Sequence, residues 1–289
     1  MKLKQFADLN KRFAISFIAL AIVVLLVIFS PIKFVSALLV LAIAAISAIG
    51  IWEYGKLAEA KDLNPAVSMM MGAAVLEVSA FFISFKFPTY SFLPVILLVA
   101  SAVCFFIRRF RDSTKALPNV SVEFFGLCYV AVPLSFLLGV LYPSSQHLVA
   151  QDGRWWLLYL IVVTKITDIG AYFVGRLWGR HKLAPILSPK KTVEGALAGF
   201  CCAVLMSVGL QMMGHEFLHG TFDLTLIESI WLGMLIGILG QVGDLAESLL
   251  KRDALVKDSN HLPGLGGVLD IVDSLLLTSP VVYFFIRAH

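Results

Sequence analysis

Long apolar runs alternate with short charged segments along nearly the whole chain. We place nine such runs, each about 17–20 residues long, which lets a helix cross about 30 Å of hydrocarbon at about 1.5 Å per residue. They cover roughly residues 13–30, 34–52, 66–85, 91–107, 123–142, 155–174, 196–213, 226–243 and 268–286. The pattern predicts an all-α polytopic integral membrane protein with about nine transmembrane helices.

The composition agrees with a membrane protein and argues against a soluble one. Of the 289 residues, 59% are hydrophobic and only 15% are charged. A soluble domain of this length needs more charge to cover its surface. The cysteines all fall in apolar runs, where we expect small buried side chains rather than disulfides or a zinc ribbon. They are Cys104, Cys128, Cys201 and Cys202.

Basic residues are strongly biased toward alternate segments between the apolar runs. Eighteen of the 23 Lys and Arg residues lie in segments 1–12, 53–65, 108–122, 175–195 and 244–267, and four lie in the other segments. Because cytoplasmic loops carry an excess of Lys and Arg, this bias predicts a cytoplasmic N-terminus and an outside C-terminus. The first run has no small-residue cleavage site, so we expect a retained helix in the cytoplasmic (inner) membrane rather than a signal peptide.

The two halves of the chain differ in where polar residues occur. Runs one to five, within residues 1–150, carry few polar residues that suggest chemistry. In residues 151–289, polar residues enter the runs themselves, and the segments between them become rich in Gly, Lys, Arg and Asp. We therefore expect N-terminal transmembrane helices followed by a C-terminal catalytic transmembrane region that contains spans six to nine and their cytoplasmic loops.

Acidic residues gather at the predicted cytoplasmic ends of the last two runs. Asp244 ends the eighth run, and Asp270 and Asp273 begin the ninth with a spacing of three, which places both on one helical face. Lys165 and Asp168 lie near the inner end of the sixth run. A charge at the bilayer centre costs about 2.5–3.5 kcal/mol, so we expect a hydrated pocket between helices. Clustered carboxylates beside water favour Mg²⁺, which prefers oxygen ligands.

Basic residues and glycines accompany these carboxylates. Lys251, Arg252 and Lys257 follow the eighth run, and the sequence PGLGG at 263–267 predicts a turn whose amides could approach a phosphate. A metal held by carboxylates beside basic side chains is suited to phosphoryl or nucleotidyl transfer.

The segment SPKKTVEG offers a second candidate anion site. We expect Ser188 and Pro189 to open the next helix, so that its N-terminus, Lys190 and Lys191 could bind an anion. A simple anchoring role at the membrane face stays open for this lysine pair.

Two blocks of the sequence resemble a known family. The stretch SLLKRDALVKDS, followed by PGLGG and LDIVD, resembles the C-terminal motif of the phosphatidate cytidylyltransferase (CDP-diacylglycerol synthase) family. TDIGAYFVGRLWGRHKLAPILSPKKTVEG resembles the family's other recurring block. The resemblance implies a Mg²⁺-dependent reaction of CTP with phosphatidic acid, which gives CDP-diacylglycerol and pyrophosphate in phospholipid biosynthesis. It implies no nucleic acid partner and leaves room for a homodimer.

The resemblance also implies roles for individual residues. Asp244, Asp270 and Asp273 would hold the metal, and Lys251, Asp270 and Asp273 would be catalytic. The substrate-binding residues would be Ser248, Arg252, Lys257, Asp258, Gly266, Gly267, Asp168, Ser188, Lys190 and Lys191.

The sequence departs from the family pattern at three places. Leu265 stands where the family has His, Ile271 stands where it has Arg, and the segment between Asp258 and Pro263 is one residue shorter. Leu cannot donate a hydrogen bond and Ile cannot neutralise a phosphate. A divergent cytidylyltransferase that acts on another lipid phosphate is therefore an alternative, and His261 is a candidate replacement for the missing imidazole.

Two alternatives come from other classes of protein. HEFLH at 215–219 has the spacing of a zinc metalloprotease motif, but it falls in a predicted outer segment, with no third ligand evident. A polytopic transporter would also place polar residues within its spans, but near the midplane of the membrane, and no inverted repeat is visible here.

Overall fold

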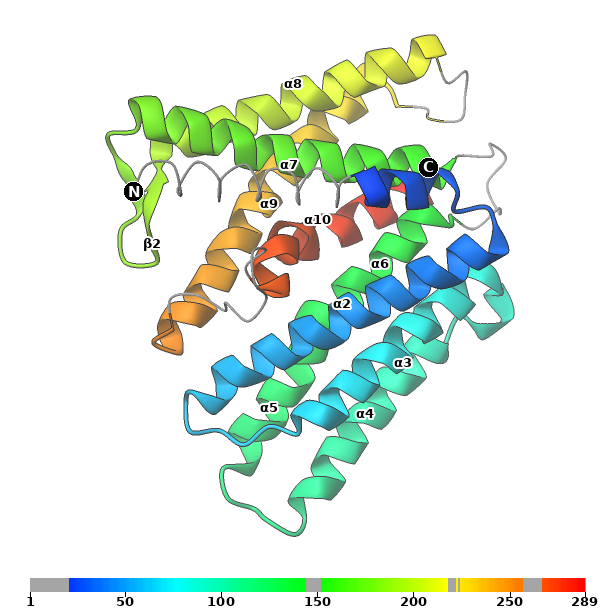
Figure 1. The fold of residues 1–289 in the computed structure, drawn as a ribbon, viewed down its shortest axis with the longest axis vertical. Helices are drawn as coiled ribbons and strands as arrows, with labels where there is room; N and C mark the ends of the chain where they lie inside the picture. The colour runs from blue at the N-terminus through cyan, green and yellow to red at the C-terminus, as the bar shows by residue number, and fades with distance from the viewer. Residues whose placement is uncertain (1–20, 144–151, 218–221, 223, 257–266, 289) are drawn as a thin grey trace, which may run out of the picture.

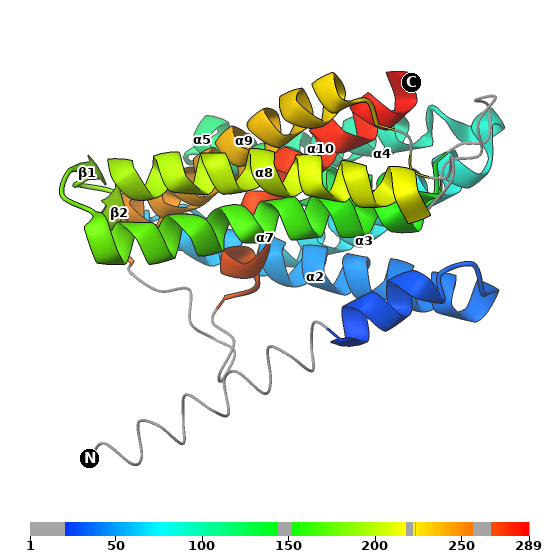
Figure 2. The same cartoon turned by 90° about the horizontal axis from the view of Figure 1, so that it is seen from above.

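The computed structural model describes residues 21–143, 152–217, 222, 224–256 and 267–288. Within these ranges the chain forms a bundle of long helices with one small hairpin (Figures 1 and 2). Residues 21–28 are helical. The elements that follow are α2 (Lys33–Glu59), α3 (Val67–Lys86), η1 (Pro88–Tyr90), α4 (Leu93–Arg109), α5 (Ala116–Gly126), η2 (Leu127–Ala131), α6 (Val132–Leu141), α7 (Gly153–Trp178), β1 (Lys182–Ala184), β2 (Ser188–Thr192), α8 (Val193–Phe217), α9 (Leu226–Asp253) and α10 (Val268–Ala288).

Eight stretches in the described part of the chain are helical, long and apolar enough to cross a membrane. They match the second to ninth predicted runs, and α5, η2 and α6 together form one of them, Ala116–Leu141. Residues 13–20 of the first predicted run lie outside the described residues, and residues 21–28 of that run are helical. The predicted polytopic, helical membrane protein is therefore confirmed.

Helix α10 belongs to two apolar cores at once. One core is built mainly on α7 and α10, with α9 contributing, around Trp156 and Ile236. The other is built on α2, α3, α4 and α6, around Met70 and Phe105. α10 contributes Val282 to the first core, and Leu269 and Leu276 to the second. The two halves of the chain are thus joined through this helix.

Segments predicted to be cytoplasmic meet at one end of the bundle. Three contacts join four of them: Lys61 Nζ to Asp253 Oδ1 at 3.0 Å, Lys115 Nζ to the Asp62 carbonyl oxygen at 2.8 Å, and Arg252 Nε to the Leu187 carbonyl oxygen at 3.0 Å. Alternate loops of a polytopic bundle must share one end, and this arrangement agrees with that requirement.

The prediction that Ser188 and Pro189 open a helix is wrong. β2 pairs antiparallel with β1, with Lys182 opposite Thr192, and α8 begins only at Val193. Thr192 Oγ1 accepts a hydrogen bond from Gly195 N at 3.2 Å, so Thr192 caps the helix. Proline suits the edge of a two-stranded sheet, where its missing N–H is not needed.

The cysteine prediction is also partly wrong. Cys104 and Cys201 are exposed on the surface of the bundle, whereas Cys128 and Cys202 are half-buried. Hydropathy places a residue in a span but does not tell which face of that helix turns outward. In a membrane protein the outward face meets lipid, where a small apolar side chain is accommodated without cost.

Candidate active site

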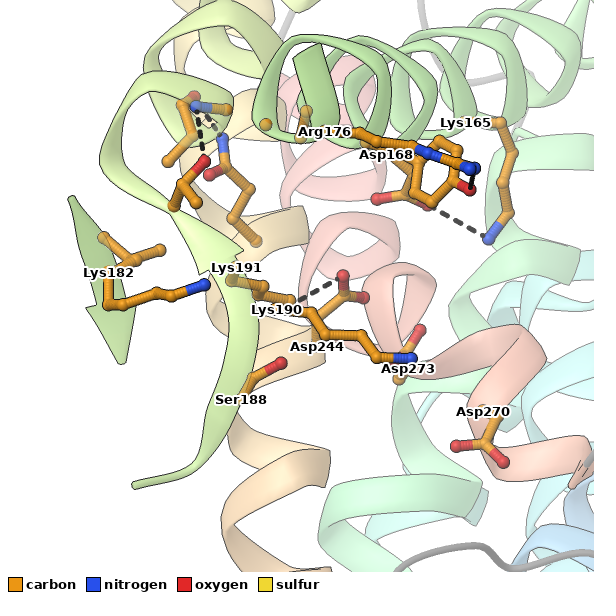
Figure 3. A pocket seen from close by; sticks show the side chains of 18 residues that line it. Lys165, Asp168, Arg176, Lys182, Ser188, Lys190, Lys191, Asp244, Asp270 and Asp273 are labelled. Atoms are coloured by element: carbon orange, nitrogen blue, oxygen red, sulfur yellow. Dashed lines mark hydrogen bonds and ion pairs between the residues drawn. The ribbon is translucent and has the colours of Figure 1, made fainter. Parts of the chain in front are cut away.

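A cavity of about 810 Å³ lies between α7, α8, α9, α10 and the β1–β2 hairpin (Figure 3). Its walls are unusually rich in charge for the interior of a membrane protein. Seven of the predicted site residues line it: Asp168, Ser188, Lys190, Lys191, Asp244, Asp270 and Asp273. The structure therefore brings residues of both recurring sequence blocks to one place.

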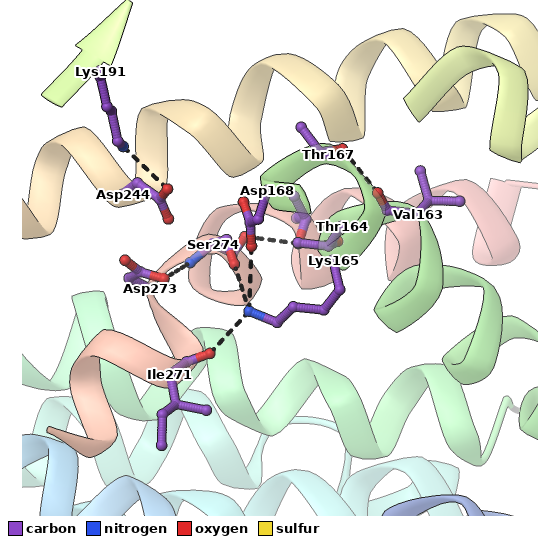
Figure 4. A network of polar contacts seen from close by, with 11 residues as sticks. Val163, Thr164, Lys165, Thr167, Asp168, Lys191, Asp244, Ile271, Asp273 and Ser274 are labelled. Carbon is purple, nitrogen blue, oxygen red and sulfur yellow. Dashed lines mark hydrogen bonds and ion pairs between the residues drawn. The ribbon is translucent and has the colours of Figure 1, made fainter. Parts of the chain in front are cut away.

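A glycine allows two of the carboxylates to meet. A Cβ atom at Gly243 would collide with the backbone carbonyl of Asp273, so α9 and α10 can approach this closely only because the position has no side chain. Asp244, the next residue, and Asp273 both line the cavity and lie beside each other (Figures 3 and 4). Lys191 Nζ lies 3.0 Å from Asp244 Oδ2, and Ser274 N donates to Asp273 Oδ1 at 2.6 Å.

Lys165 connects α7 to the start of α10 inside the cavity (Figure 4). Its Nζ lies 3.4 Å from Asp168 Oδ2 and donates to the Ile271 carbonyl oxygen and to Ser274 Oγ, both at 3.2 Å. α7 continues to Trp178, so Asp168 stands about 15 Å before the helix end. The cavity thus reaches deeper into the helical bundle than the sixth apolar run suggested.

Lys251, expected to be catalytic, lies beside Asp270 but does not line the cavity. Its side chain is buried, with 7% of the residue exposed, and its Nζ lies 2.6 Å from Glu247 Oε1. The same ammonium pairs with Asp270 Oδ1, while Gly267 N donates to Asp270 Oδ2 at 3.2 Å. Asp270 is therefore held between Lys251 and the first turn of α10, whereas Asp273 turns toward Asp244.

The remaining predicted site residues divide into two groups. Ser248 is half-buried on α9 and does not line the cavity, and Arg252 uses Nε to hold the hairpin turn at the Leu187 carbonyl oxygen. The other residues of this motif lie outside the described residues: Lys257, Asp258, His261, Leu265 and Gly266.

The sequence prediction missed several polar cavity residues, among them Lys182, Arg176 and Gln241. Lys182 reaches the site because β1 pairs with β2, and Arg176 lies on α7, where its Nη1 donates to Tyr172 Oη at 2.7 Å. Gln241 Nε2 donates to the Ala196 carbonyl oxygen at 3.1 Å and ties α9 to α8. The sequence signals for Lys182 and Arg176 were their place in the basic segment 175–195 and in the second block that resembles the family.

The side chains suit a divalent cation at one wall and an anion at the other. Within the described ranges, no three His, Cys, Asp or Glu side chains are grouped closely enough to hold a metal ion together. Mg²⁺ needs only one or two carboxylates when water and substrate phosphates supply its other ligands. Two adjoining carboxylates also repel each other unless a cation or a proton lies between them. Asp244 and Asp273 therefore fit Mg²⁺, with Lys182 and Lys190 of the hairpin lining the same cavity and Lys191 paired directly with Asp244 (Figure 3).

Eight helical stretches of the described chain that are long and apolar enough to cross a membrane, with a charged cavity between the last four, define a polytopic membrane protein with a buried polar site. Its sequence over residues 10–289 matches the cytidylyltransferase family, and the chain belongs to that family. The prediction of a nucleotidyltransferase is thereby confirmed.

Curated relatives carry a more specific name. The chain is 34% identical to the phosphatidate cytidylyltransferase of Chlamydia pneumoniae over 99% of this chain and 94% of the relative. It is 34% identical to the phosphatidate cytidylyltransferase of a Synechocystis species over 85% of this chain and 87% of the relative. A Staphylococcus epidermidis protein of the same name is 42% identical over 46% of this chain and 49% of the relative.

The metalloprotease alternative finds no support in the geometry. His215 and Glu216 lie near the end of α8, whereas Gly195 and Ala196 line the cavity at its beginning, about 30 Å away along the helix. His219, the third residue of that motif, lies outside the described residues. Membership of the cytidylyltransferase family also argues against the transporter alternative.

Proposed function

We propose that this enzyme transfers the cytidylyl group of CTP to phosphatidate, giving CDP-diacylglycerol and pyrophosphate. Two near full-length relatives are named for this activity. The observation that carries the proposal is the cavity, which pairs adjoining carboxylates with three hairpin lysines inside a membrane-spanning bundle. In this cavity a lipid phosphate at the membrane and a nucleotide triphosphate from water could meet.

The reaction needs no nucleophile from the protein. A phosphate oxygen of phosphatidate attacks the α-phosphorus of CTP, a new P–O bond forms, and the bond to the β-phosphate breaks with its electrons leaving on pyrophosphate. Catalysis then reduces to alignment of the two phosphates and neutralisation of their charge. Lys182, Lys190 and Lys191 are placed to bind the triphosphate, and Lys165 brings a positive charge beside Ile271, where the family's arginine is missing.

We further propose that Asp244 and Asp273 hold Mg²⁺. The metal would shield the charge that separates nucleophile and α-phosphorus, and it would stabilise the leaving pyrophosphate. Asp270 is the third predicted ligand, but its contacts with Lys251 and Gly267 N favour a different role, which is to fix the first turn of α10.

Residues 151–289 would carry the chemistry and residues 1–150 would support it. The site would open to the cytoplasm, where CTP is available, because the basic segments gather at the same end of the bundle as the hairpin. A homodimer in the cytoplasmic membrane remains a prediction.

The direct test is pyrophosphate release by the purified protein supplied with CTP, phosphatidate and Mg²⁺. We expect release that requires all three components. Release only with a different lipid phosphate would favour the divergent enzyme, and no release with CTP or dCTP would contradict the proposal.

Sidedness is tested separately in a cysteine-free background. Thr89 and Ser113 are both exposed, on segments predicted to face opposite sides. We expect an impermeant thiol reagent to label Thr89→Cys in intact cells, and Ser113→Cys only after permeabilisation. The reverse pattern would overturn the topology and the access of CTP to the cavity.

A further inference from the structure

Glu53 of α2 accepts hydrogen bonds from the first residues of α10. It is buried, with 2% of the residue exposed. Its Oε1 accepts from Val268 N at 2.9 Å and its Oε2 accepts from Leu269 N at 2.7 Å. One side chain from the first half of the molecule therefore binds two backbone donors of the last helix in the described chain.

These bonds satisfy both partners. The first N–H groups of a helix have no acceptor within the helix, and a carboxylate there is also favoured by the helix dipole. A buried carboxylate in turn needs hydrogen bonds to offset the loss of water, and charge-assisted bonds are the stronger kind. Gly267 N is taken by Asp270, so Glu53 and Asp270 together bind three successive donors at this helix start.

The helix start that Glu53 holds also carries the cavity carboxylate. Asp273 follows Leu269 by about one helical turn, or about 6 Å along the axis. Asp273 lies beside Asp244 across a helix crossing that tolerates no extra atom at Gly243 (Figure 4). A small shift or rotation of the first turn of α10 would therefore separate the two carboxylates.

We infer that Glu53 is a positioning residue for the reaction. It sets the height and rotation of the first turn of α10, and so places Asp273 against Asp244 at the proposed Mg²⁺ site. The inference rests on the proposed function for the identity of the metal, but the hydrogen bonds themselves do not depend on it. Glu53 itself does not line the cavity, so it acts through α10 and not by contact with substrate.

The test compares Glu53→Gln with two control variants. Glutamine keeps the shape but has one acceptor oxygen, and its NH₂ group faces a donor that it cannot accept from. Thr225→Ala removes the cap of another helix, α9, where Thr225 Oγ1 accepts from Glu228 N at 3.3 Å. Glu59→Gln changes an exposed carboxylate on α2 that pairs with Lys56.

Two readouts are measured on the full-length protein in detergent. Hydrogen exchange of the peptide covering 267–273 reports whether the first turn of α10 is held. The Mg²⁺ concentration for half-maximal thermal stabilisation, and for half-maximal pyrophosphate release, reports the metal site. For Glu53→Gln we expect faster exchange in that peptide and about a 10-fold higher Mg²⁺ requirement, as is typical when a residue that orients metal ligands is lost.

The controls separate positioning from general stability. Thr225→Ala should lower the Tm without changing the Mg²⁺ requirement, and Glu59→Gln should change neither quantity. A Glu53→Gln protein that loses Tm but keeps the wild-type Mg²⁺ requirement would overturn the inference.

If Glu53→Gln fails to fold, Glu53→Asp retains the charge with a shorter reach. It should show the same higher Mg²⁺ requirement, and an unchanged requirement would again overturn the inference. If the wild type binds Mg²⁺ but releases no pyrophosphate, the proposed function fails, while exchange and Mg²⁺ stabilisation still decide the role of Glu53.

Discussion

Two charged clusters in this molecule contain similar residue types but differ in their surroundings. In the first half, Glu123 has 0% of its surface exposed, and its Oε1 lies 2.9 Å from Arg109 Nη2 and 2.8 Å from Ala66 N. Arg109 also donates to the Asn64 carbonyl oxygen. In the second half, Asp244 and Asp273 adjoin each other with Lys191 on one side, and they border a cavity of about 810 Å³.

The difference lies in the space around the charges. Around Glu123, two arginines and the Ala66 amide close in on Oε1 and lock the start of α3 against α4 and α5, although Glu123 Oε2 and Arg109 Nε make no hydrogen bond within the described residues. Around Asp273, two carboxylates share few donors and face open volume. A concentration of charge in a membrane protein does not mark a functional site by itself. Charged side chains that border an open cavity do mark one.

The largest effect should come from the adjoining carboxylates. Asp273→Asn or Asp244→Asn keeps the shape but removes a charge from the proposed metal site, and turnover should fall about 100-fold. Pyrophosphate release measures this loss. Asp253→Asn, at an exposed position on α9, should retain turnover. Full activity in either cavity variant would contradict a role for these carboxylates in the reaction.

The next largest effect should follow from Gly243→Ala. The new methyl group would meet the Asp273 carbonyl and push α9 away from α10. We expect overpacking to cost about 1–3 kcal/mol of stability. Turnover should also fall about 10-fold or more, because catalysis is sensitive to displacements of about 1 Å.

A second glycine provides the control. Gly209 on α8 has open space where a Cβ would lie, so Gly209→Ala should leave turnover unchanged and the Tm equal or higher. Equal losses of turnover in the two variants would show that close crossing at the cavity has no special importance.

A smaller effect should come from the hairpin lysines. Lys182→Gln and Lys190→Gln each remove a cation from the cavity wall. A charge-assisted hydrogen bond contributes about 1.5–3 kcal/mol, so the KM for CTP should rise about 10-fold with a smaller change in kcat. Steady-state kinetics measure both constants, and Lys56→Gln, which pairs with Glu59 outside the cavity, is the matched control. An unchanged KM would mean that the hairpin does not bind the triphosphate.

The smallest effect on turnover should come from Glu123→Gln. This change leaves Arg109 buried beside a neutral partner, which costs about 3–5 kcal/mol of stability. We expect a clear drop in Tm, while the KM for CTP and the Mg²⁺ requirement of the folded protein stay at wild-type values. A changed KM or Mg²⁺ requirement would show that the first cluster also acts on the cavity.

The sequence was sufficient to predict the spans and the carboxylates for simple physical reasons. Apolar length is set by bilayer thickness, and a helix spacing of three places Asp270 and Asp273 on one face. The same spacing could not predict that Lys251 forms an ion pair with Asp270, because that contact depends on how α9 and α10 cross. The role of Lys182 depends on the pairing of β1 with β2, and the role of Glu53 depends on a contact with Leu269, more than 200 residues away in the sequence. Strand pairing and long-range contacts of this kind produce no periodic pattern in the sequence.

The double membership of α10 also has a consequence for biogenesis. α10 is synthesised after every helix that it packs against in the described chain, and it fills places in both apolar cores. Until it inserts, Glu53 lacks the α10 amides that it accepts from, and Asp244 lacks its neighbour. A nascent chain without α10 in the membrane therefore carries an incomplete polar site.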